Sequence, residues 1–504
     1  MTRLAHSRAL WVVVAFGVIA GVVLRVVVYR SSLGVLDGDE AVWGLMARHV
    51  LDGEFSAFFW GQGYGGTQEV LATAPLFALF GTSTVLMRAV PVALTAVAAV
   101  LVWRIGRRTI GDPGASAAAV LLWVWPPYLV WKSERAHGFY GSGLVFACLV
   151  LLLVLRLAER RSRLDVALLG LVLGLGWWQT PQIVPIALPA IAWLTWRRRA
   201  VWRDAWVAVP LAVVGALPWL VSNLEHDWWS FDVSSGETPY PTRLRGFFSS
   251  TFPMALGLRV PFTSEWLLGT ALSGLVYLAL LGLFALGWWR APNPSTRLLY
   301  VVTASFGFVY ALSPSTWIVD EPRYVVMLLP VLVLLVGQAL TTVRRAAVAV
   351  VAGVALSTLV LWQLTTSPEF ERRADGLFVP RTFAPLLEEL ERNGPRHVFA
   401  GYWVAYRLDF ETDERLVAAE ATLPTLSLHG GQVVPDRPTG LDESRHAEYD
   451  ALVRADPDAG FVLLREPPPD RTAEDAEDVR WRRLLERAGY ERTVVDGFAI
   501  YRRG

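Results

Sequence analysis

A succession of long apolar segments limits the fold of this chain more than any other feature. Hydrophobic residues make up 54% of its 504 positions, and charged residues only 18%. About 20 apolar residues in an α-helix cross the hydrocarbon core of a bilayer. The composition therefore predicts an α-helical polytopic membrane protein. We expect about 11 transmembrane helices, near residues 9–29, 84–103, 115–131, 141–157, 164–178, 181–196, 204–221, 265–289, 298–312, 322–341 and 346–364.

The distribution of arginine predicts how these spans are oriented. Lys132 is the sole lysine, so arginine carries almost all of the positive charge. Arginines precede the first span and then cluster in every second loop, at 104–108, 156–163, 197–203, 290–297 and 344–345. Because cytoplasmic loops carry the excess of basic residues, we expect the N-terminus inside and the C-terminus outside. No small-residue cleavage site follows the first span, which is therefore predicted to be an anchor helix.

The composition changes after about residue 366, where charged residues become frequent and apolar spans end. Periodicity predicts helices at 382–392 and 479–488, and short strands at 396–400, 461–464 and 498–501. Pro467-Pro468-Pro469 predicts a turn or linker between them. We therefore expect a transmembrane domain (1–366) followed by a small soluble α/β domain (367–504), which the predicted topology places outside the membrane.

Three carboxylates, Asp37, Asp39 and Glu40, follow directly on the first span. Carboxylates are costly inside a bilayer, so we expect them at its rim or in a water-filled pocket. A carboxylate there can take a proton from an acceptor hydroxyl and stabilise positive charge on a reacting sugar. The alternative is a polar loop that closes the helix, with Asp37-Gly38 as a plain turn.

A second carboxylate, Glu69, lies in the same outer loop, 30–83. It follows a glycine-rich aromatic stretch that includes Gln62 and Tyr64, and glycines allow backbone to approach a ligand closely. Glu69 and Asp37 could orient an acceptor or hold a divalent cation (Mg²⁺ or Mn²⁺), with Gln62 and Tyr64 nearby in the pocket. Alternatively, Glu69 is a charged cap on the short apolar segment 70–80, which we expect at the outer interface.

The second outer loop carries Lys132, Glu134, Arg135 and His137, and Arg323 opens a later span. Cations on the arginine-poor side are less expected by chance. Lys132, Arg135 and Arg323 could bind the phosphate of a lipid donor, with Glu134 and His137 beside them. The alternatives are an ordinary solvated loop with a Lys-Glu pair, and an arginine that snorkels to the interface.

Several chemistries are disfavoured because their motifs are missing from the sequence. It contains no phosphate-binding loop for ATP, no dinucleotide-binding glycine motif and no His-Glu-x-x-His zinc pair. A net charge of +1 gives no basic field for nucleic acid, and a single cysteine, Cys148, cannot form a disulfide within the chain.

The order of these features resembles the C-type glycosyltransferase superfamily. The resemblance rests on Leu36-Asp37-Gly38-Asp39-Glu40 after the first span, the aromatic loop 58–66, the mixed-charge second loop, and Arg323-Tyr324 before a helix that contains proline. It covers about residues 9–345. Within the superfamily the chain is most similar to bacterial relatives of glycosyltransferase family 39, which include the protein O-mannosyltransferases and the lipid A aminoarabinose transferases.

The resemblance implies an inverting sugar transfer from a polyprenyl-phosphate donor at the outer face of the cytoplasmic membrane, to a protein, glycan or lipid acceptor. The Asp-Glu pair of the family matches Asp39-Glu40, which makes Asp39 the expected base. Trp228-Trp229 is followed by Ser230, so the oligosaccharyltransferase signature is absent. Two other readings remain open: a transporter or flippase whose carboxylates bind an ion, and a non-catalytic scaffold that displays the outer domain.

Overall fold

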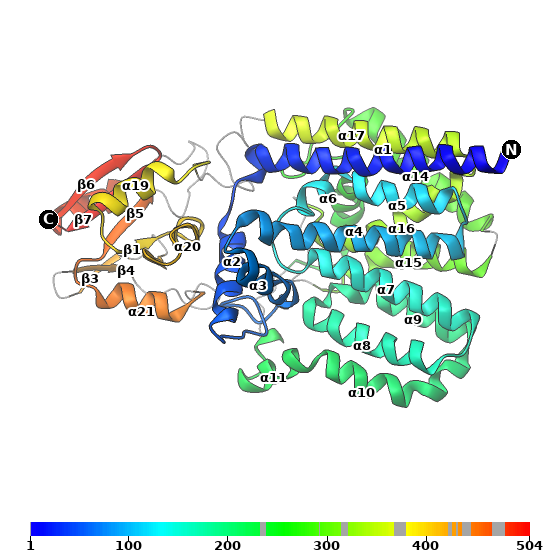
Figure 1. Cartoon of the computed structure of the whole chain (residues 1–504), viewed down its shortest axis with the longest axis horizontal. Coiled ribbons are helices and arrows are strands. Elements are labelled where there is room, and N and C mark those ends of the chain that lie inside the picture. The colour runs from blue at the N-terminus through cyan, green and yellow to red at the C-terminus, as the bar shows by residue number, and fades with distance from the viewer. Residues whose placement is uncertain are drawn as a thin grey trace. The chain divides into compact units, whose positions relative to one another are not determined.

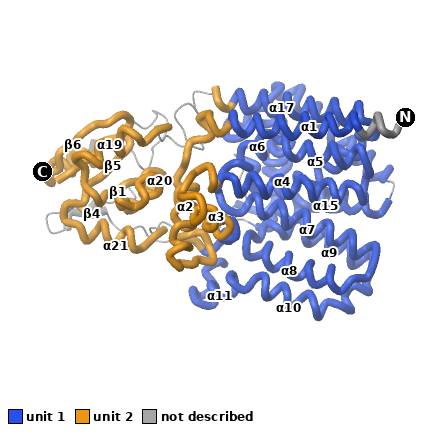
Figure 2. Tube along the Cα trace, in the orientation of Figure 1, with its two compact units in different colours: residues 1–27, 63–69, 88–363 blue, residues 28–62, 70–87, 364–504 orange. Residues whose placement is uncertain are grey.

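The structure is a computed structural model, and it describes residues 2–231, 238–291, 293–313, 321–366, 380–421, 426–429, 432–435, 445–465 and 479–503. The chain divides into two compact units, each of which draws on separate stretches of sequence (Figure 2). Unit 1 comprises residues 1–27, 63–69 and 88–363, and unit 2 comprises residues 28–62, 70–87 and 364–504.

The named elements of unit 1 are helices, many of them long and apolar (Figure 1). They are α1 (Thr2–Arg30), α4 (Thr84–Thr109), α5 (Gly114–Val124), α6 (Pro127–Lys132), α7 (Tyr140–Glu159), α8 (Arg163–Gln179), α9 (Val184–Arg197), α10 (Ala205–Gly215), α11 (Leu217–Glu225), α12 (Tyr240–Gly246), α13 (Phe252–Ala255), α14 (Thr270–Trp289), α15 (Pro294–Tyr310), α16 (Leu329–Ala339) and α17 (Val343–Thr366). Apolar side chains on α1 and α14 are largely exposed, as expected of helices that face lipid.

Among the described residues, five helices are long and apolar enough to cross a membrane, and a bent pair of helices would make a sixth. The five are Arg8–Arg30, Thr84–Thr109, Tyr140–Glu159, Thr270–Trp289 and Val343–Thr366, and the pair joins Arg199–Gly215 to Leu217–Glu225 at 57°. The structure thus confirms a mainly helical membrane protein, but this criterion does not reach the expected count of about 11.

Each of the other predicted spans does contain a helix, but none of these helices is longer than the 17 residues of α8 and α15. The span at 115–131 is split into α5 and α6 at Pro126, and the span at 181–196 begins with a 3-10 turn at Pro181–Ile183 before α9. Proline lacks an N–H donor and clashes with the preceding turn, so it interrupts helices that the hydropathy pattern reads as continuous.

Helices α8 and α10 pack closely because small residues line their contact. A Cβ added at Gly170 would lie 2.1 Å from the carbonyl oxygen of Ala208, and one added at Gly174 would lie 2.0 Å from that of Ala212. Glycines four residues apart let two membrane helices approach backbone to backbone.

Unit 2 contains helices from the first outer loop together with a small α/β domain. Its elements are α2 (Gly38–Leu51), most of α3 (Gln68–Phe80), α19 (Ala384–Asn393), β1 (His397–Ala400), α20 (Tyr402–Glu411), β2 (Val417–Glu420), β3 (Leu426–His429), β4 (Gln432–Pro435), α21 (Ala447–Ala455), β5 (Gly460–Leu464), α22 (Val479–Arg487), β6 (Tyr490–Val495) and β7 (Phe498–Arg503). The five elements predicted from periodicity are confirmed, and Pro467-Pro468-Pro469 lies outside the described residues.

The main sheet has five strands in the order β2-β1-β5-β7-β6. Strand β1 pairs in parallel with β2 and β5, and β7 pairs antiparallel with β5 and β6. Alternate strand residues point to opposite faces. Val398 therefore packs in a core with α19 and α20, whereas its neighbour Phe399 packs in a second core with α21 and α22.

Candidate functional site

The acidic motif lies at the N-terminus of α2, in unit 2. Asp37 is the N-cap, and its Oδ1 accepts the backbone N–H of Glu40 at 2.9 Å. Capping by Asp and the partial positive charge of a helix N-terminus both favour carboxylates here. Asp37 and Glu40 are buried and Asp39 is half-buried. Asp37-Gly38 therefore begins a helix and is not a plain turn.

Asp39 is held by a residue from the C-terminal part of the chain. Its Oδ1 accepts the phenol O–H of Tyr402, at the start of α20, at 2.5 Å. The guanidinium of Arg445 lies 4.8 Å from the Tyr402 ring centroid and donates to Gln62 Oε1 at 3.0 Å. Asp39 and the predicted pocket residue Gln62 therefore share one network in unit 2, through two residues that sequence reasoning missed.

Glu69 is buried in unit 1. One of its oxygens accepts both the backbone N–H and the hydroxyl of Ser142, at 2.8 and 2.5 Å. Burial raises the pKa of Glu69 to about 7, although the two hydrogen bonds from Ser142 oppose that rise. A carboxyl with a pKa near neutrality can exchange a proton under physiological conditions. A solvated carboxylate that only caps a helix would not have such a raised pKa.

The structure gathers predicted cations of unit 1 around Glu321. Lys132 Nζ lies 3.8 Å from Glu321 Oε2, and the Tyr128 hydroxyl donates to the same oxygen at 2.8 Å. Arg323 pairs with Glu321 Oε1. His137 Nδ1 is 3.4 Å from Lys132 Nζ. The buried carboxylate therefore brings together Lys132 and Arg323, which are far apart in sequence.

The second outer loop is buried, so the alternative of an ordinary solvated loop is wrong. Lys132, Glu134 and Arg135 each expose less than a twentieth of their surface, whereas Tyr64 remains 37% exposed. The loop is joined to α1 by Arg25, a charged residue inside the first span that sequence reasoning overlooked. Its guanidinium donates to Ser133 Oγ at 3.1 Å and to the carbonyl of Trp123 at 2.9 Å.

A signal in the sequence could have identified some of the missed residues. An arginine inside a membrane helix, such as Arg25, is a candidate functional residue by default. Glu321 stands two residues from Arg323, and Ser142 lies close to the second outer loop. Tyr402 and Arg445 lie in a domain whose own pattern indicates only a sheet and helices, so no local signal connects them with Asp39.

One group of side chains in unit 2 has metal-ligand chemistry. Potential ligand atoms of His49, Glu54 and His446 lie within 4.8 Å of one another. Two imidazoles and one carboxylate suit zinc better than Mg²⁺, which prefers oxygen. Both ring nitrogens of His49 already contact carboxylates, Nδ1 to Glu54 at 2.6 Å and Nε2 to Glu414 at 2.8 Å. A protonated imidazole fits these contacts, and the group shares no residue with Asp37 and Glu69, where the sequence allowed Mg²⁺ or Mn²⁺.

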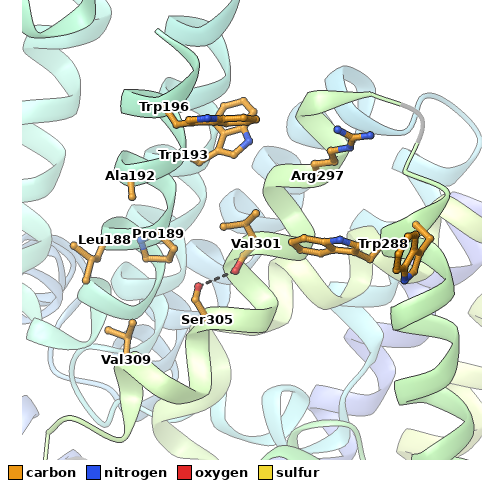
Figure 3. Close-up of a pocket in the computed structure, with 11 residues that line it drawn as sticks. Leu188, Pro189, Ala192, Trp193, Trp196, Trp288, Arg297, Val301, Ser305 and Val309 are labelled. Carbon is orange, nitrogen blue, oxygen red and sulfur yellow. Dashed lines mark hydrogen bonds between the residues drawn. The ribbon is translucent and has the colours of Figure 1, made fainter. Parts of the chain in front are cut away.

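A hollow of about 760 Å³ in unit 1 lies away from these groups (Figure 3). It is bounded by α9, α14 and α15, and no predicted site residue lines it. Its walls are mainly apolar, with Trp193, Trp196, Trp288 and Trp289 around it and Arg297 at one side. We do not include it in the candidate site, because a transferase needs acid, base and phosphate-binding groups.

Comparison with known proteins agrees with this combination of features. Residues 71–224 match the family model described as dolichyl-phosphate-mannose-protein mannosyltransferase. No curated protein matches the chain.

Two crystal structures of ArnT from Cupriavidus metallidurans are similar in fold. The one described as bound to undecaprenyl phosphate has 15% identity and a TM-score of 0.59, and it covers 96% of this chain and 97% of its own. The one in the apo state has 13% identity and a TM-score of 0.62 over the same shares of the two chains. At such low identity the likeness shows the fold, and it extends over nearly the whole of both chains.

The family match covers residues 71–224, and the likeness to ArnT concerns the fold of nearly the whole chain. The chain is thus similar to the dolichyl-phosphate-mannose-protein mannosyltransferase family over that segment, and it has an ArnT-like fold. The resemblance drawn from the sequence is confirmed. Of the three readings left open by the sequence, the family match favours the enzyme.

Proposed function

We propose that this protein moves a sugar from a polyprenyl-phosphate donor to an acceptor hydroxyl, with inversion at the anomeric carbon and with Asp39 as general base. The observation that carries the proposal is the setting of Asp39. It is a half-buried carboxylate in the first turn of a helix, with one oxygen fixed by a hydrogen bond. The polyprenyl carrier is suggested by the undecaprenyl phosphate named for the ArnT structure.

The reaction follows from this assignment. Asp39 removes the proton of the acceptor hydroxyl as the acceptor oxygen attacks the anomeric carbon. The bond between that carbon and the donor phosphate oxygen breaks on the opposite face, and the bonding electrons leave with the phosphate. The products are the glycoside, with inverted configuration, and free polyprenyl phosphate. The proton on Asp39 then passes to solvent or to the departing phosphate.

The departing phosphate gains negative charge and needs cations. Lys132 and Arg323 are the candidates, because both already lie against a buried carboxylate, Glu321. Phosphate and carboxylate attract the same donors, so a set of cations arranged around one can receive the other. Arg135 is the third candidate, from the same buried loop. Glu40 and Glu69 would shape the acceptor side, with Asp37, Gln62, Tyr64, Glu134 and His137 as further pocket residues.

The arginine-rich loops support an orientation with the acidic motif and the C-terminal domain on the outer face of the cytoplasmic membrane. The transmembrane domain (1–366) would bind the donor, and its first outer loop (30–83) would supply the base. The acceptor is a protein, a glycan or a lipid with a free hydroxyl. We derive no step through a metal ion.

The test is turnover in proteoliposomes. Radiolabelled polyprenyl-phosphate sugars are supplied with cell-envelope extract as acceptor, and release of free polyprenyl phosphate is measured. The Asp39→Asn variant keeps the size and the acceptor atom of the side chain but loses its basicity. We expect it to lower kcat by about 10²- to 10⁴-fold, the usual contribution of a general base.

Asp52→Asn is the matched control, because Asp52 is exposed at the other end of α2. It should keep wild-type turnover. Wild-type turnover in folded Asp39→Asn would refute Asp39 as base. No wild-type turnover with a broad donor panel would refute the transferase with a polyprenyl donor, and ion and lipid flux would then be measured for the transporter alternative.

A further inference from the structure

We infer that Tyr402, a residue of the C-terminal domain, is the positioning residue of the proposed base, and that Arg445 holds Tyr402 in place. The inference rests on the proposed function, because it gives the C-terminal domain a role in the same site. The phenol O–H fixes one oxygen of Asp39 and leaves the other for the acceptor hydroxyl.

The hydrogen bond from Tyr402 to Asp39 is made from the first residue of a helix. Strand β1 ends at Ala400, and Tyr402 is the first residue of α20. Its hydroxyl donates to Asp39 Oδ1 at 2.5 Å. The ring is packed edge-on against Trp403, with centroids 4.8 Å apart and planes at 90°, and against Tyr406 at 5.3 Å and 62°. Neighbouring rings on the same helix therefore restrict how the phenol can turn.

Arg445 joins this ring to the aromatic loop. Its guanidinium lies 4.8 Å from the Tyr402 ring centroid and 5.2 Å from that of Phe59. The same group donates to the carbonyl of Trp60 and to Gln62 Oε1, both at 3.0 Å. A guanidinium whose Nη1 donates to two acceptors and which lies beside two aromatic rings has little freedom to move. The glycine-rich stretch thus brings its backbone close to Arg445.

A glycine makes this approach of Arg445 feasible. Gly61 has a φ of +69°, and a Cβ there would lie 2.9 Å from the Cα of Arg445. An L side chain at this position would be strained by both the backbone angle and the contact. The glycine-rich stretch, which predicted the close approach of a ligand, therefore also allows Arg445 to come close to the backbone.

The phenol is a donor throughout the physiological pH range. Burial, and after it the negative charge of Asp39, raises the pKa of Tyr402 well above its ordinary value of 10. Tyr402 therefore keeps its proton, and Asp39 can only accept from it. The contact therefore holds the Asp39 carboxylate in one orientation.

Helices α2 and α20 are joined along their length, which makes the position of Tyr402 relative to Asp39 reproducible. A Cβ on Gly38 would lie 3.1 Å from the Tyr402 ring, and one on Gly44 would lie 2.2 Å from Phe410. At the far end of α2, Arg48 pairs with Asp413 at 2.7 Å. Catalytic groups must be held in a defined geometry, and these contacts restrict the movement of α2 against α20.

The test uses the full-length protein with Tyr402→Phe, which removes the O–H and retains the ring. Tyr490→Phe is the matched control, since Tyr490 is a buried tyrosine of the same domain whose hydroxyl donates elsewhere, to the carbonyl of Ala459 at 3.3 Å. We expect kcat to fall by about 10- to 100-fold in Tyr402→Phe, with the donor KM unchanged. The control should keep wild-type values.

The division of the effect between kcat and KM gives a readout that a merely structural role would not move. Without the phenol donor, one oxygen of Asp39 is no longer fixed, so kcat should fall while the KM of the acceptor keeps its wild-type value. Arg445, Asp37 and Glu40 remain in the variant, so a fall in kcat alone would report the loss of this donor.

Hydrogen–deuterium exchange tests the contact without any turnover. The peptide that contains residues 36–46 should exchange faster in Tyr402→Phe than in the wild type and in Tyr490→Phe. Arg445→Lys, which keeps the charge but loses the fork, should show a smaller change in the same direction. Wild-type kcat, KM and exchange in Tyr402→Phe would overturn the inference while Asp39→Asn could still support the proposed function. If the wild-type protein shows no turnover, both the proposed function and the role of Tyr402 in it are overturned. Exchange would then report only whether the contact between Tyr402 and Asp39 exists.

Discussion

His49 offers the sharpest prediction about how α2 is held in unit 2. It lies near the C-terminal end of α2, where its Nε2 contacts Glu414 Oε1 at 2.8 Å and its Nδ1 contacts Glu54 Oε2 at 2.6 Å. Burial by itself would lower the pKa of His49, but the hydrogen bonds and negative charges of the two carboxylates raise it to about 9. The imidazole is therefore a cation that pairs with the carboxylates of Glu54 and Glu414, and His49→Gln would remove its charge.

The size of the effect follows from the pKa. A rise from 6.5 to about 9 corresponds to about 3 kcal/mol, at about 1.4 kcal/mol for each tenfold change in the acid dissociation constant. Glu54 is 54% exposed, so solvent screens its share of the interaction. We expect His49→Gln to weaken the packing of α2 within unit 2 by about 1–2 kcal/mol. Amide hydrogen exchange in α2 should then be faster by about 5- to 30-fold.

The sign of the pH dependence is fixed by the direction of the shift. The pKa of His49 is higher in the folded state, so its stabilisation is complete below pH 6.5 and is lost as the pH rises through about 9. Hydrogen–deuterium exchange of α2, corrected for the intrinsic pH dependence, should show protection falling between pH 7 and 9.5 in the wild type. The fall should be absent in His49→Gln.

A second histidine–carboxylate pair provides the control. His397, on β1, contacts Asp456 at 2.6 Å, and His397→Gln should leave the exchange of α2 unchanged. Equal loss of protection with pH in the wild type and in His49→Gln would refute the charged pair. Stoichiometric zinc bound by the wild type and lost in His49→Gln would instead support a metal at His49.

Two further predictions concern unit 1. Gly174→Val should force α8 away from the carbonyl of Ala212 and lower the free energy of unfolding by about 1–3 kcal/mol. Gly274→Val is the control and should be neutral, because a Cβ there would meet nothing within 4 Å. Similar melting curves for the two variants would contradict the close packing. Ser142→Ala should raise the pKa of Glu69 above its value of about 7, since it removes one of two donors that oppose the effect of burial. The acid limb of the transferase pH–rate profile should then move to higher pH by about one unit, and an unmoved limb would show that the ionisation of Glu69 does not govern the rate.

The local parts of the fold could be predicted because their causes are local. Apolar runs indicated a helix at each predicted span, and alternation of apolar residues indicated β1, β5 and β7. Strands β2, β3, β4 and β6 were missed, as were α20 and α21. Several of these elements are only four residues long, and such short runs carry little periodicity. Proline breaks shortened helices that a hydropathy window reads as continuous spans.

The candidate site also combines residues that the sequence could identify with properties that it could not predict. Asp37, Asp39 and Glu40 stand out because three carboxylates beside an apolar span have few structural explanations. Lys132 and Arg323 stand out because cations on the arginine-poor side run against the charge bias. The pKa of Glu69 could not be predicted, because it depends on burial and on Ser142, which is 73 residues away.

The sequence by itself determined that this is a mainly helical membrane protein and pointed to Asp39 as the proposed base, since these follow from composition and from motifs of a few neighbouring residues. Tertiary structure alone decided which groups surround that base. Tyr402 meets Asp39 across 363 positions of sequence, and Glu321 joins Lys132 to Arg323. Such contacts depend on how helices and strands pack in three dimensions, and that packing leaves no local periodicity in the chain from which they could be read.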